Sequence, residues 1–268
     1  MPDRVLRTDE ELAALDLANE VELWQRSTSL LPDGASGREG AVLWISSGIP
    51  AEFANQVVVD GDGADAAALG RAVGELRRRF HPFQVRIRAD RDDGLVPAIE
   101  ALGLHENPDE ASPAMALEAL GAVEELQAPD GLDIRPVTDV QGLSAHVDVV
   151  SESFGLPLEL ARLLFPPAGL AVPGFTAFVG YHEERPVASS FGFTTGEVVG
   201  VYNVGTLEPV RRRGYAAAMT RRAIADGATH GATVAILQTS QLGRRVYEAI
   251  GFHVVQQFRV FVEPGADD

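Results

Sequence analysis

The stretch VRRRGYAAAMTRRA, residues 210–223, places three consecutive arginines directly before a glycine and an alanine-rich run. The strand-like segment EVVGVYNVGTL precedes it, so the pattern predicts a turn from a strand into a helix at Arg211 to Ala216. The start of a helix carries unpaired N–H groups and partial positive charge, and it therefore attracts anions. Gly214 and Ala216 let a ligand approach the backbone, and arginines bind phosphate oxygens strongly. These residue types in this order favour a pyrophosphate site.

The alternative interpretation is that the three arginines form an ordinary solvated surface, because short motifs often match by chance. Cationic side chains at a helix N-terminus oppose the helix macrodipole, however. Without a bound anion the arrangement is locally unfavourable, and this consideration favours a ligand.

A second block, SQLGRRVYEAIGF at residues 240–252, has a tyrosine shortly before a terminal Gly-Phe pair. The two blocks, in this order and spacing, resemble the GNAT superfamily of N-acetyltransferases over roughly residues 131–263. The resemblance implies that acetyl-CoA is the co-substrate and that Tyr247 acts as a general acid on the departing thiolate. It also implies contacts between the cofactor and the following residues: Val204, Gly205, Thr206, Arg211, Arg212, Arg213, Gly214, Tyr215, Ala216 and Ser240. The chain departs from the family pattern at Ser240, where asparagine is usual, and at Glu208-Pro209, where the order is reversed.

Patterning predicts the elements that must position these residues. In the C-terminal half we expect strands at 132–138, 197–207, 234–239 and 258–263, helices at 139–154, 157–165, 213–231 and 243–250, and a hairpin at 175–195 that turns at residues 182–185. Residues 85–104 and 234–252 follow a similar course, and each ends in Glu-Ala-(Leu/Ile)-Gly-(Leu/Phe). We therefore predict an α+β fold, a mixed α/β architecture of two GNAT-like domains, at 1–126 and 127–268. In each, helices flank a mostly antiparallel central sheet.

The N-terminal half lacks the chemistry of the C-terminal half. Its corresponding loop, VVVDGDGADAAALG, carries Asp60, Asp62 and Asp65, whose carboxylates would repel a pyrophosphate. Ile99 occupies the position that matches Tyr247. A calcium loop is not indicated, because the glycine and glutamate that it needs are replaced by Asp65 and Arg71. We interpret this half as a degenerate copy, and we expect no metal.

Composition excludes several classes of function. The chain has no cysteine, which rules out disulfides and thiolate chemistry, and its formal net charge of -17 argues against nucleic-acid binding. No apolar run approaches the roughly 20 residues that span a bilayer, and no signal core is present at the N-terminus, so we expect a cytoplasmic protein without membrane contact. The acidity suits a cationic substrate or simply keeps the surface solvated.

The remaining titratable side chains favour ordinary roles. His146 lies in a region that borders the acceptor site in the family; it could be a base or an acceptor contact, but an ordinary helix-surface position is the better expectation. Glu152 could attract an amine or relay a proton, and a surface position is an equal alternative. His182 is expected to be solvated in the hairpin turn. Three functions compete: an acetyl-CoA-dependent N-acetyltransferase acting on a small-molecule or peptide amine, a non-catalytic acyl-CoA-binding sensor or regulatory module, and a structural interaction protein. A homodimer stays open.

Overall fold

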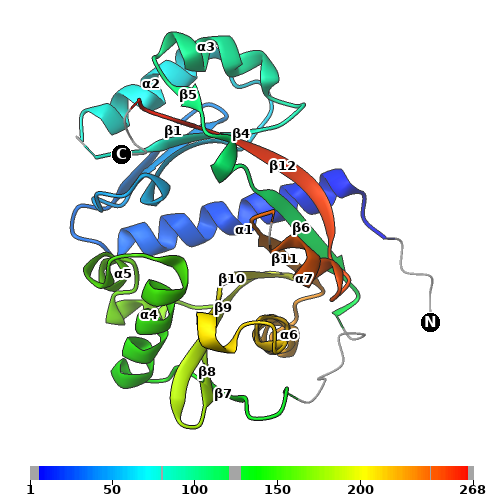
Figure 1. The fold of residues 1–268 in the computed structure, drawn as a ribbon. Coiled ribbons are helices and arrows are strands. Elements are labelled where there is room, and N and C mark those ends of the chain that lie inside the picture. The colour runs from blue at the N-terminus through cyan, green and yellow to red at the C-terminus, as the bar shows by residue number, and fades with distance from the viewer. Residues whose placement is uncertain (1–5, 80, 121–127, 242, 265–268) are drawn as a thin grey trace. The chain divides into compact units, whose positions relative to one another are not determined.

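The computed structural model describes residues 6–79, 81–120, 128–241 and 243–264, and it divides the chain into two compact units. Unit 1 consists of Met1–Glu20 and Met115–Val255, and unit 2 of Val21–Ala114 and Gln256–Asp268. The first helix, α1 (Asp9–Ser29), and two strands, β6 (Pro113–Glu118) and β12 (His253–Val262), have residues in both units (Figure 1). The units are therefore interleaved along the chain. The boundary expected between residues 126 and 127 lies outside the described residues and stays a prediction.

Unit 1 is built on a mixed sheet with the strand order β6-β11-β10-β9-β8-β7. Its remaining strands are β7 (Asp133–Pro136), β8 (Phe175–His182), β9 (Arg185–Thr195), β10 (Val198–Thr206) and β11 (Val234–Gln238). Its helices are α4 (Val140–Phe154), α5 (Leu158–Leu164), α6 (Tyr215–Thr229) and α7 (Arg244–Glu248). The β7–β8, β8–β9 and β9–β10 pairs are antiparallel, whereas β10 and β11 are parallel and are connected through α6. The predicted hairpin, with its turn at Glu183 and Glu184, lies at β8–β9.

Alternating side chains of the central strands give unit 1 a core on each face of its sheet. Val199 and Val201 of β10 belong to the same cluster as Tyr215 and Met219 of α6. Val198, one position earlier, faces the other way and clusters with Leu12 of α1, together with Val234 and Ile236 of β11. This period of two is the one that strand geometry requires.

Unit 2 repeats the plan on a smaller scale, with the strand order β1-β2-β3-β4-β12 and with β5 paired to β12. The strands are β1 (Ala35–Glu39), β2 (Val42–Ser46), β3 (Asn55–Val59), β4 (Gln84–Arg88) and β5 (His105–Glu106), and the helices are α2 (Ala66–Arg77) and α3 (Val96–Ala101). The parallel pair β3–β4 is connected through α2, as β10–β11 is through α6. The predicted α+β fold with two similar halves is confirmed.

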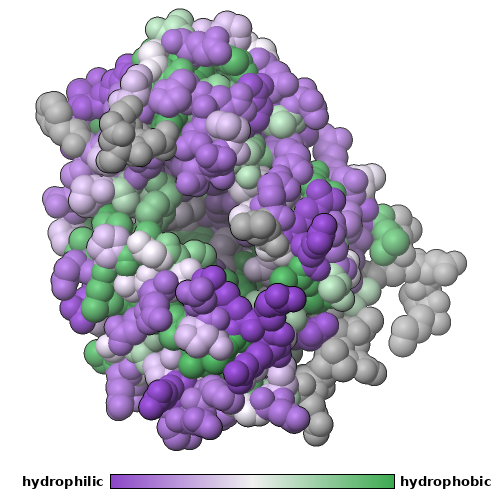
Figure 2. Space-filling view, viewed as in Figure 1, coloured by the Kyte–Doolittle hydropathy of each residue, from purple (hydrophilic) through white to green (hydrophobic). Residues whose placement is uncertain are grey.

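Helix α1 was not predicted, although the sequence carries a signal for it. Thr8 and Glu11 form a capping box, in which the Glu11 N–H donates to Thr8 Oγ1 over 3.2 Å and the Thr8 N–H donates to Glu11 Oε2 over 2.8 Å. Asp9, Glu10 and Glu11 in the first turn complement the helix dipole. Within the described residues, no helix is both long enough and apolar enough to cross a membrane. The face in Figure 2 is mostly hydrophilic with smaller apolar patches, in keeping with the charge of the chain.

Candidate functional site

The C-terminal end of β10 departs from regular pairing. Parallel pairing with β11 runs from Val198 to Gly200, and past that point the described register contains no further pair between the two strands. On the other side, the register with β9 shifts between Tyr202 and Gly205, where Asn203 has a positive φ of 50°. Such a bulge redirects a strand and leaves backbone groups unpaired. Of the predicted contact residues, Val204 lies within this shift, and Gly205 and Thr206 follow it, paired with β9.

Thr206 ends β10 with an unusual side chain. Its Oγ1 atom is buried and has no hydrogen-bond partner among the described residues. A buried hydroxyl without a partner costs free energy, so an orphaned atom at this position is an observation that a ligand would explain.

The turn between β10 and α6 is shaped by two left-handed residues. Arg212 has a φ of 66° and Gly214 a φ of 81°. Gly214 is the N-cap of α6, and no side chain caps this helix. A Cβ placed on Gly214 would meet only Pro129 Cγ, at 3.5 Å, so the space above the helix start is open. The first N–H groups of this 15-residue helix are thereby left without a side-chain cap.

The three arginines of this turn are exposed. Arg211 Nε donates to the Thr206 carbonyl over 3.1 Å, and Arg213 Nη1 lies 3.4 Å from His182 Nε2. Among the described residues, none of Arg211, Arg212 and Arg213 forms an ion pair. The turn therefore presents positive charge beside free N–H groups, which is the combination that binds phosphate.

Tyr215 begins α6, and its side chain is in the core with 1% of its surface exposed. Its hydroxyl lies 3.0 Å from His182 Nδ1. Of the residues predicted to wrap the pyrophosphate, Tyr215 can therefore contribute its backbone N–H and not its ring. His182 was expected to be solvated, but it is half-buried, and its Nδ1 also lies 2.9 Å from the Gly131 carbonyl oxygen. That expectation was wrong, because the hairpin turn folds back onto the start of α6.

Tyr247 lies on α7 and is 9% exposed, in the core cluster that also holds Tyr215. Its ring meets Phe252 edge to face, with centroids 6.2 Å apart. Burial raises the pKa of the Tyr247 phenol to about 12, since the ionised form would lose its hydration. The phenol is therefore protonated throughout the neutral range, and it is a weaker acid than an exposed tyrosine.

Ser240, the remaining predicted contact, is exposed in the turn after β11. Its Oγ accepts a hydrogen bond from the Gly243 N–H over 3.3 Å, and its carbonyl accepts from the same N–H over 3.1 Å. The hydroxyl thus supports the turn that leads into α7.

His146 occupies a different environment from the one expected. It lies on α4 with none of its surface exposed, and its Nδ1 lies 3.2 Å from the Phe178 carbonyl oxygen. Burial lowers the pKa of His146 to about 4. The expectation of a surface histidine was wrong: His146 is a neutral core residue that links α4 to β8. Glu152 on the same helix is exposed, which is compatible with both alternatives considered for it.

In unit 2, the turn between β3 and α2 corresponds to the turn between β10 and α6, but it carries aspartates where the other turn carries arginines. Asp65 caps α2 by accepting from the Ala68 N–H over 2.7 Å. Asp60 pairs with Arg38, and Asp62 with Arg91. Ile99, the counterpart of Tyr247, is fully buried. No group of three or more His, Cys, Asp or Glu side chains in the described residues could hold a metal ion.

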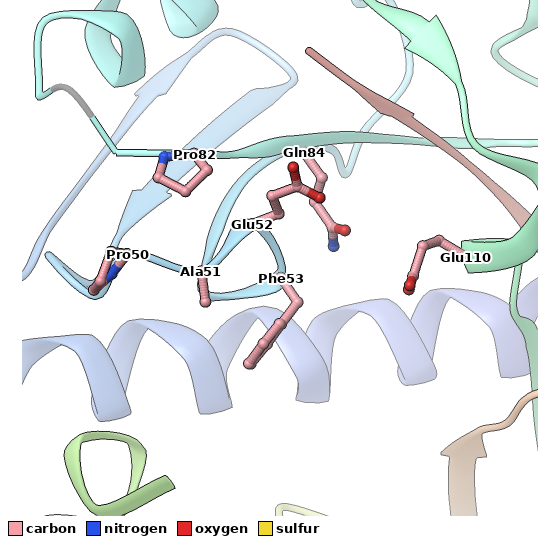
Figure 3. A pocket seen from close by; sticks show the side chains of 7 residues that line it. All are labelled: Pro50, Ala51, Glu52, Phe53, Pro82, Gln84 and Glu110. Atoms are coloured by element: carbon pink, nitrogen blue, oxygen red, sulfur yellow. The ribbon is translucent and has the colours of Figure 1, made fainter. Parts of the chain in front are cut away.

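Unit 2 also contains a cavity of about 450 Å³, at the opposite ends of its parallel strands from this turn (Figure 3). It is lined by Pro50, Ala51, Glu52, Phe53, Pro82, Gln84 and Glu110. Its charged lining residues are carboxylates, so this cavity is unsuited to a phosphate ligand.

Solved structures with the same fold cover nearly the whole chain. A GCN5-related N-acetyltransferase from Kribbella flavida has a TM-score of 0.71 at 20% identity, and the match covers 94% of this chain and 96% of that one. A tandem GNAT protein from the clavulanic acid biosynthesis pathway has a TM-score of 0.60 at 12% identity, covering 92% and 94%. A GCN5-related N-acetyltransferase from Sphaerobacter thermophilus has a TM-score of 0.57 at 19% identity, covering 83% and 76%.

No protein-family profile and no curated protein sequence matches the chain. The chain nevertheless has the fold of the GNAT superfamily in its tandem form, as the resemblance of its motifs implied.

Proposed function

We propose that the protein is an acetyl-CoA-dependent N-acetyltransferase that acts on an amine of a small molecule or peptide. The observation that carries the proposal is the turn at residues 211–216, where an uncapped helix start lies beside three arginines that have no carboxylate partner among the described residues. The structural neighbours named as N-acetyltransferases support the same reaction class.

The residues of the turn and of β10 fit the chemical groups of coenzyme A. The N–H groups of Tyr215 and Ala216 and the arginine side chains would hold the pyrophosphate. The backbone of Val204 and Gly205, beyond the last pair with β11, would hydrogen-bond the amides of the pantetheine arm as an added strand does. The orphaned Thr206 hydroxyl would gain a partner there.

In the proposed reaction the acceptor nitrogen forms a bond to the thioester carbonyl carbon, and the carbon–sulfur bond breaks. A backbone N–H of β10 stabilises the negative oxygen of the intermediate. Tyr247 donates its phenolic proton to the departing sulfur, which leaves as a thiol, and the proton that the acceptor nitrogen loses returns to the phenolate through solvent. The positioning of both reactants lowers the barrier further, because it converts a bimolecular encounter into a local one.

One observation favours a second candidate, a non-catalytic acyl-CoA-binding module. A phenol with a pKa of about 12 is a weaker acid than a thiol, whose ordinary pKa is about 8.5. Proton transfer from Tyr247 to a thiolate is then uphill unless cofactor binding changes the surroundings of the phenol. This candidate retains coenzyme A binding and loses turnover.

Thermal unfolding with and without acetyl-CoA, followed by a screen of amines for thiol release, tests both candidates. Ligand at 100 times its dissociation constant should stabilise the fold by about 2.7 kcal/mol, which raises the midpoint by a few degrees. Stabilisation with thiol release supports the enzyme, and stabilisation without release for any amine supports the binding module. No stabilisation at millimolar acetyl-CoA would contradict both.

The net charge of the protein supports a proposal about the charge of the acceptor. The net charge of -17 favours a cationic acceptor, since an acidic protein attracts cations electrostatically.

The expected cytoplasmic location, the homodimer and the absence of nucleic-acid and membrane partners stay predictions.

A further inference from the structure

His182 lies at the tip of the β8–β9 hairpin, yet its contacts are with other elements. Its ring nitrogens lie 3.0 Å from the Tyr215 hydroxyl and 3.4 Å from Arg213 Nη1, both at the start of α6, and 2.9 Å from the Gly131 carbonyl oxygen. The hairpin tip is thus joined to the turn at residues 211–216 through one imidazole.

The contacts determine which nitrogen carries the hydrogen. A carbonyl oxygen only accepts, so Nδ1 is the N–H that faces Gly131, and Nε2 holds the lone pair. Arg213 Nη1 therefore donates to Nε2. At 3.4 Å the hydrogen bond is long, and it occupies only Nη1, so the other guanidinium N–H groups of Arg213 remain available to phosphate oxygens.

The acidic side chains near the hairpin tip form no ion pair with Arg213 among the described residues. Glu184 Oε1 pairs with Arg135 Nη2 over 2.8 Å, and Asp133 pairs with the same guanidinium over 2.6 Å. Glu183 forms no ion pair with Arg213 in the described residues. Among the described residues, the side-chain partner of Arg213 is therefore an imidazole and not a carboxylate.

We propose that His182 is a positioning residue of the phosphate site, which orients the Arg213 guanidinium without neutralising it. A carboxylate at the same place would hold Arg213 more tightly, but it would compete with the phosphate for the same N–H groups. A side chain without an acceptor would leave a flexible arginine to be ordered by the ligand, at a cost in affinity. The inference rests on the proposed binding of coenzyme A.

Calorimetric titration of coenzyme A into four proteins tests the proposal: the parent, His182→Gln, His182→Ala and His182→Glu. A Gln amide reaches the position of Nε2 and supplies a neutral acceptor, so we expect an affinity close to that of the parent. We expect His182→Ala to weaken binding about threefold, and His182→Glu about tenfold or more, because the carboxylate both occupies Arg213 and repels phosphate. Unfolding midpoints of all four proteins are recorded alongside.

The same substitutions in an Arg213→Ala background separate positioning from a merely structural effect. We expect the His182→Ala penalty to disappear there, since nothing is left to position. A penalty that persists in that background, or equal affinities for Gln and Glu, would overturn the role of His182 while leaving the cofactor site intact. If the parent itself does not bind coenzyme A, the proposed function fails and the inference fails with it.

Discussion

In each unit, a strand leads into a helix that returns to a parallel strand: β3–α2–β4 in unit 2 and β10–α6–β11 in unit 1. At the start of α2, Asp65 fills the cap, and Asp60 and Asp62 are paired with arginines. At the start of α6, Gly214 provides no capping side chain, and the arginines have no carboxylate partner in the described part of the chain. The two turns share a plan and carry opposite charge.

The difference shows how a helix start is opened or closed to an anion. A capping carboxylate satisfies an N–H group and cancels the local positive potential, so α2 has no need of a ligand. In α6 the same groups are left unsatisfied and are reinforced by Arg211–Arg213. Stability favours the first arrangement and binding favours the second. The proposed coenzyme A site therefore lies in unit 1, and the following predictions test that contrast.

The largest effect is expected at the pair of equivalent helix positions, Tyr247 and Ile99. If Tyr247 is the general acid, Tyr247→Phe should lower kcat by about 100-fold or more and leave coenzyme A affinity unchanged. Since the pKa of Tyr247 is about 12, its ionisation should not reduce turnover between pH 7 and pH 10. Steady-state kinetics on the best acceptor and titration calorimetry measure the two quantities. Ile99→Val is the matched control, and unchanged turnover in Tyr247→Phe would remove Tyr247 from the reaction.

The unfolding free energies of the two units should also respond differently to acidic pH. The folded pKa of His146, about 4, lies below its ordinary 6.5, so between these values the unfolded chain binds a proton and the folded chain does not. The unfolding free energy of unit 1 should therefore fall by roughly 3 kcal/mol as pH drops from 6.5 to 4. In unit 2, Arg91 lowers the pKa of Asp62 from 3.8. The stability that Asp62 gains from this pairing is fully present above pH 3.8, the unfolded pKa, and it is lost as the pH falls through the lower pKa of the folded state.

Hydrogen exchange of α4 and α2 amides between pH 7.5 and pH 4.5 reports the two units separately. His146→Asn places an amide N–H near the position of Nδ1, which keeps a donor for the Phe178 carbonyl, and it cannot take up a proton, so it should flatten the acid response of α4. An acid response of α4 that is the same in the parent and in His146→Asn would contradict this assignment.

The sequence predicted what local pattern controls and missed what distant contacts control. The turn at Arg211–Ala216 was predicted because arginines, glycine and a strand-to-helix transition are neighbours in the chain. The burial of His146 depends on Phe178, 32 residues away, and the contacts of His182 depend on a hairpin folding back onto α6. The interleaving of the units depends on α1 and β12, which lie near opposite ends of the chain. Neither periodicity nor motif spacing carries such information.

After the predictions for Tyr247 and His146, the next effect is expected at Gly214, on coenzyme A affinity. Gly214→Glu should weaken coenzyme A binding about 100-fold, because a carboxylate at the helix start repels phosphate and a side chain at a φ of 81° is strained. Gly214→Ala separates the two causes, since it introduces the strain without the charge. We expect the alanine variant to retain most of the stabilisation by acetyl-CoA in thermal unfolding. Equal losses in the two variants would mean that loop shape, and not charge, controls binding.

The smallest effect is expected at Asp65, whose removal opens the helix start of unit 2. Asp65→Ala leaves the Ala68 N–H without its side-chain acceptor, and loss of such a cap costs about 1 kcal/mol of unfolding free energy. Urea unfolding measures that cost. Asp65→Asn keeps the cap without the charge and should recover most of it. Neither variant should change coenzyme A affinity, because the turn in unit 2 keeps Asp60 and Asp62 and has no run of unpaired arginines. If Asp65→Ala altered coenzyme A binding, the α2 turn would belong to the ligand site, and the assignment of binding to α6 alone would be wrong.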